Sequence, residues 1–128
     1  MLITREEAMK YLKVGNHGLV ALMDSGKIYK TTMHKKSYFN PANINEFLLE
    51  HSDGKITITD TLLSTKEAQK YLNCDWRQFN RLCKKCNFAC YRISESANAK
   101  TFYKYKDLKR YKDEFERIKR IKESMQRT

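Results

Sequence analysis

Apolar residues recur at helical spacing near the start of the chain and predict a first helix over residues 5–12. Ala8, Tyr11 and Leu12 form its apolar face, which we expect to be buried. Thr4 has a side chain suited to capping the start of this helix, and an acidic residue follows three positions later, near the reciprocal capping position. The first predicted element is therefore a short amphipathic helix.

The next stretch predicts a second helix, a hairpin and a third helix. The second helix covers residues 16–24, and a Ser-Gly pair follows it, as is usual just past a helix end. Two strand-like pieces, residues 28–32 and 37–39, flank a polar segment, and a third helix begins at Pro41. The buried stripe expected on the second helix is Leu19, Leu22 and Met23.

The chain repeats this pattern once, 60 positions later. The identical pairs at this offset are Glu7/Glu67, Ala8/Ala68, Lys10/Lys70, Tyr11/Tyr71 and Leu12/Leu72. Further apolar pairs are Leu19/Phe79, Leu22/Leu82, Met23/Cys83, Ile28/Phe88 and, with four extra residues in the second copy, Ile44/Leu108 and Phe47/Tyr111. Ser64 or Thr65 takes the capping place of Thr4. Because the register holds over both stretches, we expect two copies of one structural unit.

The charge of the chain points to a polyanionic partner. There are 26 Lys+Arg against 15 Asp+Glu, a net charge of +11, and such a surplus favours nucleic acid. No apolar run is long enough to cross a bilayer and no signal peptide is recognised, so we expect a cytoplasmic protein with no membrane partner. The charge is unevenly divided, since residues 1–52 hold 7 basic and 5 acidic residues and residues 53–128 hold 19 and 10.

These residues carry a resemblance to a known family. The resemblance lies in the run Thr/Ser-x-Glu/Lys-Glu-Ala-x-x-Tyr-Leu, a second helix, Ser-Gly-x-Ile, a basic hairpin and Pro-x-x-Ile-x-x-Phe. Through these motifs the chain is similar in sequence to the excisionase and MerR-type winged helix family. The match covers residues 2–50 and, more loosely, 62–112, where Cys86 replaces Gly26 and Tyr105 replaces Pro41. The resemblance implies binding to duplex DNA, with the second helix in the major groove and the hairpin (the wing) against the backbone or minor groove.

The expected fold is mainly α with small β wings (α+β), in two tandem winged helix-turn-helix units followed by a long C-terminal helix. We assign residues 1–52 to the first unit, 53–61 to a linker, 62–112 to the second unit and 113–128 to a helical extension.

The second helix of the second copy has side chains typical of a recognition helix. When its apolar positions are buried, the outward face carries basic and hydrogen-bonding side chains, namely Arg77, Gln78, Asn80, Arg81, Lys84 and Lys85. Arginine and glutamine can make bidentate contacts with base edges, and lysines suit phosphates. A merely solvated helix face is the alternative.

The first copy has poorer DNA-reading residues at the matching places, which are Asn16, His17, Gly18, Val20 and Ala21. We therefore expect it to pair with a partner protein or to contact DNA only through its wing. The expected wing contacts are His34, Lys35 and Lys36 in the first copy and Arg92, Lys100 and Lys104 in the second. Solvated hairpins are the alternative here too.

Aromatic residues interleaved with these charges leave single-stranded DNA open as a ligand, because bases stack on aromatic rings. They are Tyr38, Phe39, Tyr91, Phe102, Tyr103 and Tyr105. Strand alternation instead predicts that one member of each adjacent pair lies in the core.

Four cysteines, Cys74, Cys83, Cys86 and Cys90, raise the question of a zinc site. Cys74 and Cys83 match apolar residues of the first copy, so packing is the favoured interpretation, and no metal or other cofactor is expected.

The end of the chain, residues 107–125, predicts one long helix with an apolar stripe. The stripe is Leu108, Tyr111, Phe115, Ile118, Ile121 and Met125. Two interpretations stay open: packing on the first unit, or pairing with a second chain as a homodimer.

The leading hypothesis is a small regulator or recombination/excision accessory factor of a phage, plasmid or other mobile element, which reads duplex DNA mainly with its second unit. The alternative is a single-stranded-DNA-binding accessory protein of a replication or DNA-processing complex that docks on a partner enzyme. An enzyme is not expected, since no nucleophile-base pair, paired carboxylates or phosphate loop stands out.

Overall fold

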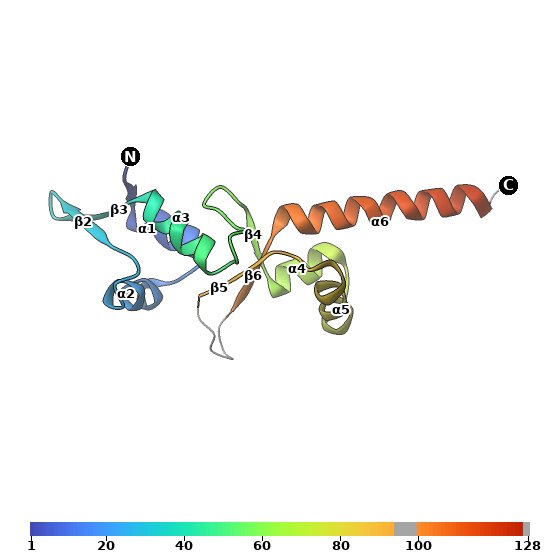
Figure 1. Cartoon of the computed structure of the whole chain (residues 1–128), viewed down its shortest axis with the longest axis horizontal. Coiled ribbons are helices and arrows are strands. Elements are labelled where there is room, and N and C mark those ends of the chain that lie inside the picture. Colours follow the sequence, from blue (N-terminus) through green and yellow to red (C-terminus); the bar gives the residue numbers. More distant parts are fainter. Residues whose placement is uncertain (94–99, 127–128) are drawn as a thin grey trace. The chain divides into compact units, whose positions relative to one another are not determined.

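The computed structural model describes residues 1–93 and 100–126, which form a mixed α+β chain in two compact units (Figure 1). Unit 1 is Met1–Thr59 and unit 2 is Asp60–Thr128. The described residues contain two small three-stranded antiparallel sheets and six helices, the last of which is long and C-terminal. The last two residues of the predicted extension, 127 and 128, lie outside the described residues.

Both units have the element order strand, helix, helix, strand, strand, helix. Unit 1 contains β1 (Ile3–Thr4), α1 (Arg5–Leu12), α2 (Asn16–Asp24), β2 (Lys30–Met33), β3 (Lys36–Phe39) and α3 (Pro41–Glu50). Unit 2 contains β4 (Leu62–Ser64), α4 (Thr65–Leu72), α5 (Trp76–Cys86), β5 (Cys90–Arg92), β6 (Thr101–Lys104) and α6 (Tyr105–Gln126).

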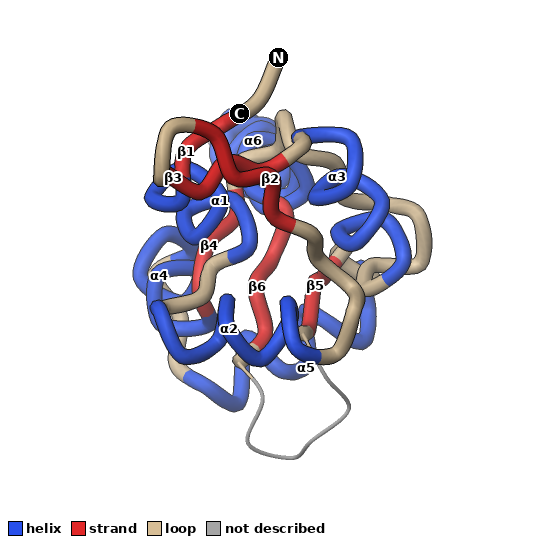
Figure 2. Tube along the Cα trace, turned by 90° about the vertical axis from the view of Figure 1, so that its left-hand side faces the viewer, coloured by secondary structure: helices blue, strands red, loops and turns tan. Residues whose placement is uncertain are grey.

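The two sheets have the same topology and the same register. The strand order is β1-β3-β2 in unit 1 and β4-β6-β5 in unit 2, so the strand before the final helix is central in each (Figure 2). Ile3 lies opposite Phe39 in unit 1, and the matching residues Leu63 and Tyr103 lie opposite each other in unit 2. The repeat seen in the sequence is therefore present in the pairing of the strands.

The first helix of each unit begins at a capping box. In unit 1 the Thr4 hydroxyl accepts from the Glu7 backbone N–H at 3.3 Å, and the Glu7 carboxylate accepts from the Thr4 N–H at 3.4 Å. Ser64 and Glu67 make the same two bonds at 3.2 and 3.0 Å. Each box satisfies two backbone N–H groups that the helix leaves unpaired, which stabilises these starts.

Several predicted boundaries of the hairpin and of the last helix differ from the structure by one or two residues. The first hairpin strand of unit 1, β2, starts at Lys30, because the backbone N–H of Ile28 bonds to the Leu22 carbonyl at 3.4 Å and that of Tyr29 bonds to the Asn43 side chain at 3.1 Å. The long final helix starts at Tyr105 rather than at residue 107.

Four core positions of unit 2 repeat those of unit 1. Ala68, Phe79, Phe88 and Leu108 form its buried cluster, and their partners in the repeat, Ala8, Leu19, Ile28 and Ile44, are equally buried. Burying a large apolar side chain contributes about 1.5–3 kcal/mol, so these matched positions supply much of the stability of each unit.

Tyr11 does not have the buried position that its spacing predicts, since it is 36% exposed. Its counterpart Tyr71 contacts the Tyr105 ring edge-on at 5.4 Å, and the Lys112 ammonium lies 4.4 Å from the Tyr71 ring centre. Unit 1 has Pro41 where unit 2 has Tyr105, so Tyr11 lacks the aromatic neighbour that covers Tyr71.

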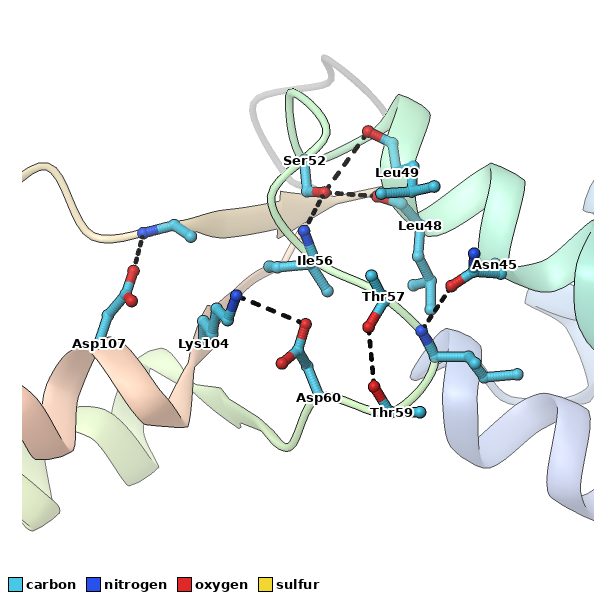
Figure 3. Close-up of polar contacts among 12 residues, drawn as sticks. Asn45, Leu48, Leu49, Ser52, Ile56, Thr57, Thr59, Asp60, Lys104 and Asp107 are labelled. Carbon is cyan, nitrogen blue, oxygen red and sulfur yellow. Dashed lines mark hydrogen bonds and ion pairs between the residues drawn. The ribbon is translucent and has the colours of Figure 1, made fainter.

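Residues 53–59, part of the predicted linker, are tied to α3 (Figure 3). The buried Ser52 hydroxyl donates to the Leu48 carbonyl at 2.6 Å and accepts from the Ile56 N–H at 2.9 Å. The Asn45 side chain accepts from the Ile58 N–H at 2.8 Å. These bonds bring Ile56 into the buried set and make the segment an ordered part of unit 1.

Candidate nucleic-acid interface

Helix α5 is held in unit 2 by one apolar side. Phe79 is buried and meets the Tyr103 ring edge-on at 5.0 Å, while Leu82 and Cys83 are half-buried against the same cluster. The helix is two residues longer than α2, and it ends at Asn87 in a left-handed conformation (φ 52°) that asparagine tolerates. Anchoring on this side fixes which side chains point outward.

The opposite side of α5 carries the six residues expected to contact DNA, and every one of them is exposed. They are Arg77, Gln78, Asn80, Arg81, Lys84 and Lys85. None of the four cations has an ion-pair partner among residues 1–93 and 100–126. The sequence prediction of an outward basic face is therefore matched by the position of these side chains, and their charges are available to an anionic ligand.

Gln78 has a second task that its sequence position did not reveal. Its side-chain oxygen accepts from the Asp75 backbone N–H at 3.2 Å, and the Asp75 carboxylate accepts from the Gln78 N–H at 2.8 Å. This capping box holds the start of α5. It also engages the oxygen that a bidentate adenine contact would use, which leaves Asn80 as the better amide for that contact.

The three hairpin residues of unit 2 do not form one cluster. Arg92 pairs with Thr101 in the β5–β6 ladder, and Lys100 is exposed just before β6, so both lie at the loop end of the hairpin. Lys104 lies at the other end of β6, opposite Leu62, and its ammonium is 3.7 Å from the Asp60 carboxylate (Figure 3). Lys104 is therefore placed apart from the other two.

The hairpin of unit 1 presents its basic tip in a strained turn. His34 and Lys35 form a two-residue loop, both with positive φ (50° and 65°), between Met33 and Lys36, which pair in the ladder. Such turns usually contain Asn-Gly, because positive φ is energetically unfavourable for most other residues. His34, Lys35 and Lys36 are all exposed.

Helix α2 lacks the chemistry of α5. Its sequence contains no lysine or arginine, and the places of Asn80 and Arg81 are taken by exposed Val20 and Ala21. Gly18, expected on the outward face, is instead half-buried, and a Cβ there would stand 2.9 Å from the Val14 Cβ. The two matching helices therefore present different surfaces.

Sequence reasoning missed Trp76, the first residue of α5, whose side chain is 62% exposed. Its match in unit 1 is Asn16, a polar residue whose side-chain oxygen accepts a hydrogen bond from the Arg5 guanidinium. A tryptophan at a position where the other copy has a solvent-facing asparagine is the signal that would have found it.

Most of the interleaved aromatic residues face inward. Tyr91, Phe102 and Phe39 are buried, and Tyr103 is half-buried against Phe79. Burial raises the pKa of Tyr103 to about 12, with the neighbouring Cys83 adding to the shift. Core packing therefore accounts for the hairpin rings better than a stacking surface does.

The cysteines divide into two pairs by exposure. Cys74 and Cys83 are half-buried against the unit 2 cluster, and burial raises the pKa of both thiols. Cys86 and Cys90 are exposed. Within residues 1–93 and 100–126, no three His, Cys, Asp or Glu side chains are grouped in a way that could hold a metal ion.

The apolar stripe of α6 changes character along the helix. Leu108 is buried and Tyr111 is half-buried against the unit 2 cluster. Beyond them the stripe is exposed, at Phe115, Ile118, Ile121 and Met125. The second half of α6 thus carries an apolar face in contact with solvent.

None of the described helices combines the length and apolar character needed to cross a bilayer. No family model, curated protein or solved structure matches the chain.

Proposed function

We propose that the chain is a duplex-DNA-binding protein of two winged helix-turn-helix units, in which α5 of unit 2 enters the major groove. One observation carries this proposal: the exposed face of α5 holds Asn80 and four cations with no ion-pair partner among the described residues, whereas α2 has no lysine or arginine and has Val20 in place of Asn80. At 11 residues the helix is about 16 Å long, enough to lie along the groove.

The element order supports the winged-helix part of the proposal. Helices α4 and α5 are joined by a short turn at residues 73–75, and the β5–β6 hairpin follows. In this arrangement the second helix reads bases while the hairpin reaches the backbone. Lys100, exposed at the loop end, is the hairpin residue best suited to a phosphate contact, whereas Arg92 is half-buried and Lys104 is engaged with Asp60.

We assign unit 1 a different role. Its α2 carries no lysine or arginine, and the side-chain oxygen of its one asparagine, Asn16, is bonded to Arg5. Any contact of unit 1 with DNA therefore runs through His34, Lys35 and Lys36 at the hairpin tip, or the unit binds a partner protein. A homodimer through the exposed stripe of α6 stays a prediction that a solution mass measurement tests. In the cell we propose the role of a cytoplasmic regulator or recombination accessory factor of a mobile element.

The test compares duplex and single-stranded DNA of the same sequence over a series of salt concentrations. Arg77→Ala/Arg81→Ala should weaken duplex binding by at least about tenfold, because each bidentate arginine contact contributes about 1–3 kcal/mol. Lys10→Ala/Lys27→Ala removes the same charge from exposed positions of unit 1 and serves as the control. Unchanged duplex affinity in the Arg77/Arg81 variant would refute α5 as the reader.

A second function, a single-stranded-DNA-binding accessory protein, is favoured by the exposed ring of Trp76, since indole stacks on unpaired bases. Equal or tighter binding to the single strand than to the duplex would select this function over the first.

A further inference from the structure

Trp76 has an unusual place for so large an apolar side chain. It is the one tryptophan of the chain, it is the first residue of α5, directly after the capping residue Asp75, and 62% of it is exposed. The fold does not need an aromatic ring there, because the matching helix of unit 1 begins with Asn16 at this position. The ring is therefore available for a ligand.

Its neighbours on the helix belong to the proposed DNA-binding face. Trp76, Asn80 and Lys84 are spaced four residues apart, so they follow one another along one side of α5. Arg77 comes next to Trp76 in the chain and is exposed as well. The indole thus lies at the N-terminal end of the face, and this end of a recognition helix is the one that approaches base edges.

The chemistry of the major groove restricts what an indole can meet there. Base edges in the groove present hydrogen-bond donors and acceptors, which suit arginine and asparagine, and one apolar group, the C5-methyl of thymine. Bases in an intact duplex are stacked, so their faces are covered. An apolar ring that enters the groove gains most by covering that methyl group.

We propose that Trp76 packs on the C5-methyl group of a thymine in the major groove and gives α5 a preference for A·T pairs. Asn80, one turn further along the same side, can bond to an adenine edge and reinforce this preference. The proposal rests on the proposed duplex binding.

The experiment removes only the methyl group. An alternating A–T duplex of about two helical turns is compared with the same duplex containing deoxyuridine in place of thymine. The wild-type chain should bind the thymine duplex about fourfold more tightly, the factor that one buried methyl group provides. Trp76→Ala should bind the two duplexes equally. Because Trp76 is the sole tryptophan, its fluorescence should also change on addition of the thymine duplex.

Tyr29→Ala is the matched control, since Tyr29 is an equally exposed aromatic residue (65%) in unit 1. It should keep the preference for thymine. Circular dichroism verifies that both variants are folded.

Four outcomes overturn the inference. Equal wild-type affinity for the two duplexes would refute the thymine contact, and so would a preference for thymine that survives in Trp76→Ala. Neither result would contradict the proposed duplex binding. A larger fluorescence change with single-stranded oligothymidine than with the duplex, and no methyl preference, assigns the ring to stacking on unpaired bases. Failure to bind either duplex refutes the proposed function together with this inference.

Discussion

Two lysines in the last turn of α5 permit a quantitative test of the proposed binding to DNA. Lys84 and Lys85 are exposed in the last turn of the helix and have no ion-pair partner among the described residues. If α5 lies in the groove, these ammonium groups neutralise phosphates at the groove edge, and each displaces counterions from the DNA. We therefore consider the double change Lys84→Ala/Lys85→Ala.

The expected effect is a change in salt dependence. The logarithm of the binding constant falls with the logarithm of the salt concentration by about 0.9 for each phosphate contact in duplex DNA. Losing two contacts should make this slope shallower by about 1.8. The loss of affinity should be the same for unrelated duplex sequences, because phosphates carry no sequence information.

Fluorescence anisotropy with two unrelated duplexes, between about 50 and about 200 mM salt, measures the slope. The lysines also interact favourably with the C-terminal end of the helix dipole, at about 0.3–1 kcal/mol each, so binding is measured well below the unfolding temperature. Lys10→Ala/Lys27→Ala again removes two charges from unit 1. A slope that is unchanged in the Lys84/Lys85 variant, or that changes equally in the control, would refute phosphate contact by α5.

Three further predictions concern stability. Replacing His34-Lys35 by Asn-Gly should raise the free energy of unfolding by about 1 kcal/mol, because both residues adopt positive φ; a lower denaturation midpoint would contradict this assignment of the turn. Leu108→Ala should lower the free energy of unfolding by about 2–5 kcal/mol, because Leu108 is buried. Ile118→Ala, at an exposed position, should change it by less than about 0.5 kcal/mol. Equal losses for the two variants in the same denaturation assay would refute the difference in packing. The pKa of Tyr103 is raised from 10.0 to about 12, so the stability that this group contributes is present below pH 10 and is lost as the pH rises towards 12. The Tyr103→Phe variant should therefore lose less stability over this pH range. An identical pH profile for the variant and the wild type would contradict the burial of the hydroxyl.

The sequence was sufficient for the features that depend on near neighbours. The bounds of α1 and α2 follow from caps and apolar spacing, which act within one or two helical turns. The outward direction of Arg77 and Arg81 follows from the burial of Phe79 on the opposite side of the helix. Such features require no knowledge of what the rest of the chain does.

Features that depend on distant residues could not be predicted in this way. Tyr11 is exposed because Pro41, far along the chain, leaves it without the ring that covers Tyr71. Lys104 forms an ion pair because Asp60 lies at its end of the sheet, and strand spacing alone does not predict this arrangement. The exposure of Trp76 could have been suspected from its match with Asn16, but only the structure gives its extent.

The contrast between the two units favours a division of labour over two equal binding sites. Each unit keeps its fold as long as the matched inward positions stay apolar, so its outward positions are free to change without loss of the core. Those positions have changed in one direction: α5 carries cations and amides where α2 has valine and alanine. A second reading helix would have needed the same side chains, whereas an exposed, nearly uncharged helix suits contact with protein, because interface cores are poor in charge. Under the proposed function, unit 1 therefore fits better as the part of the molecule that binds a partner protein than as a second reader of the DNA.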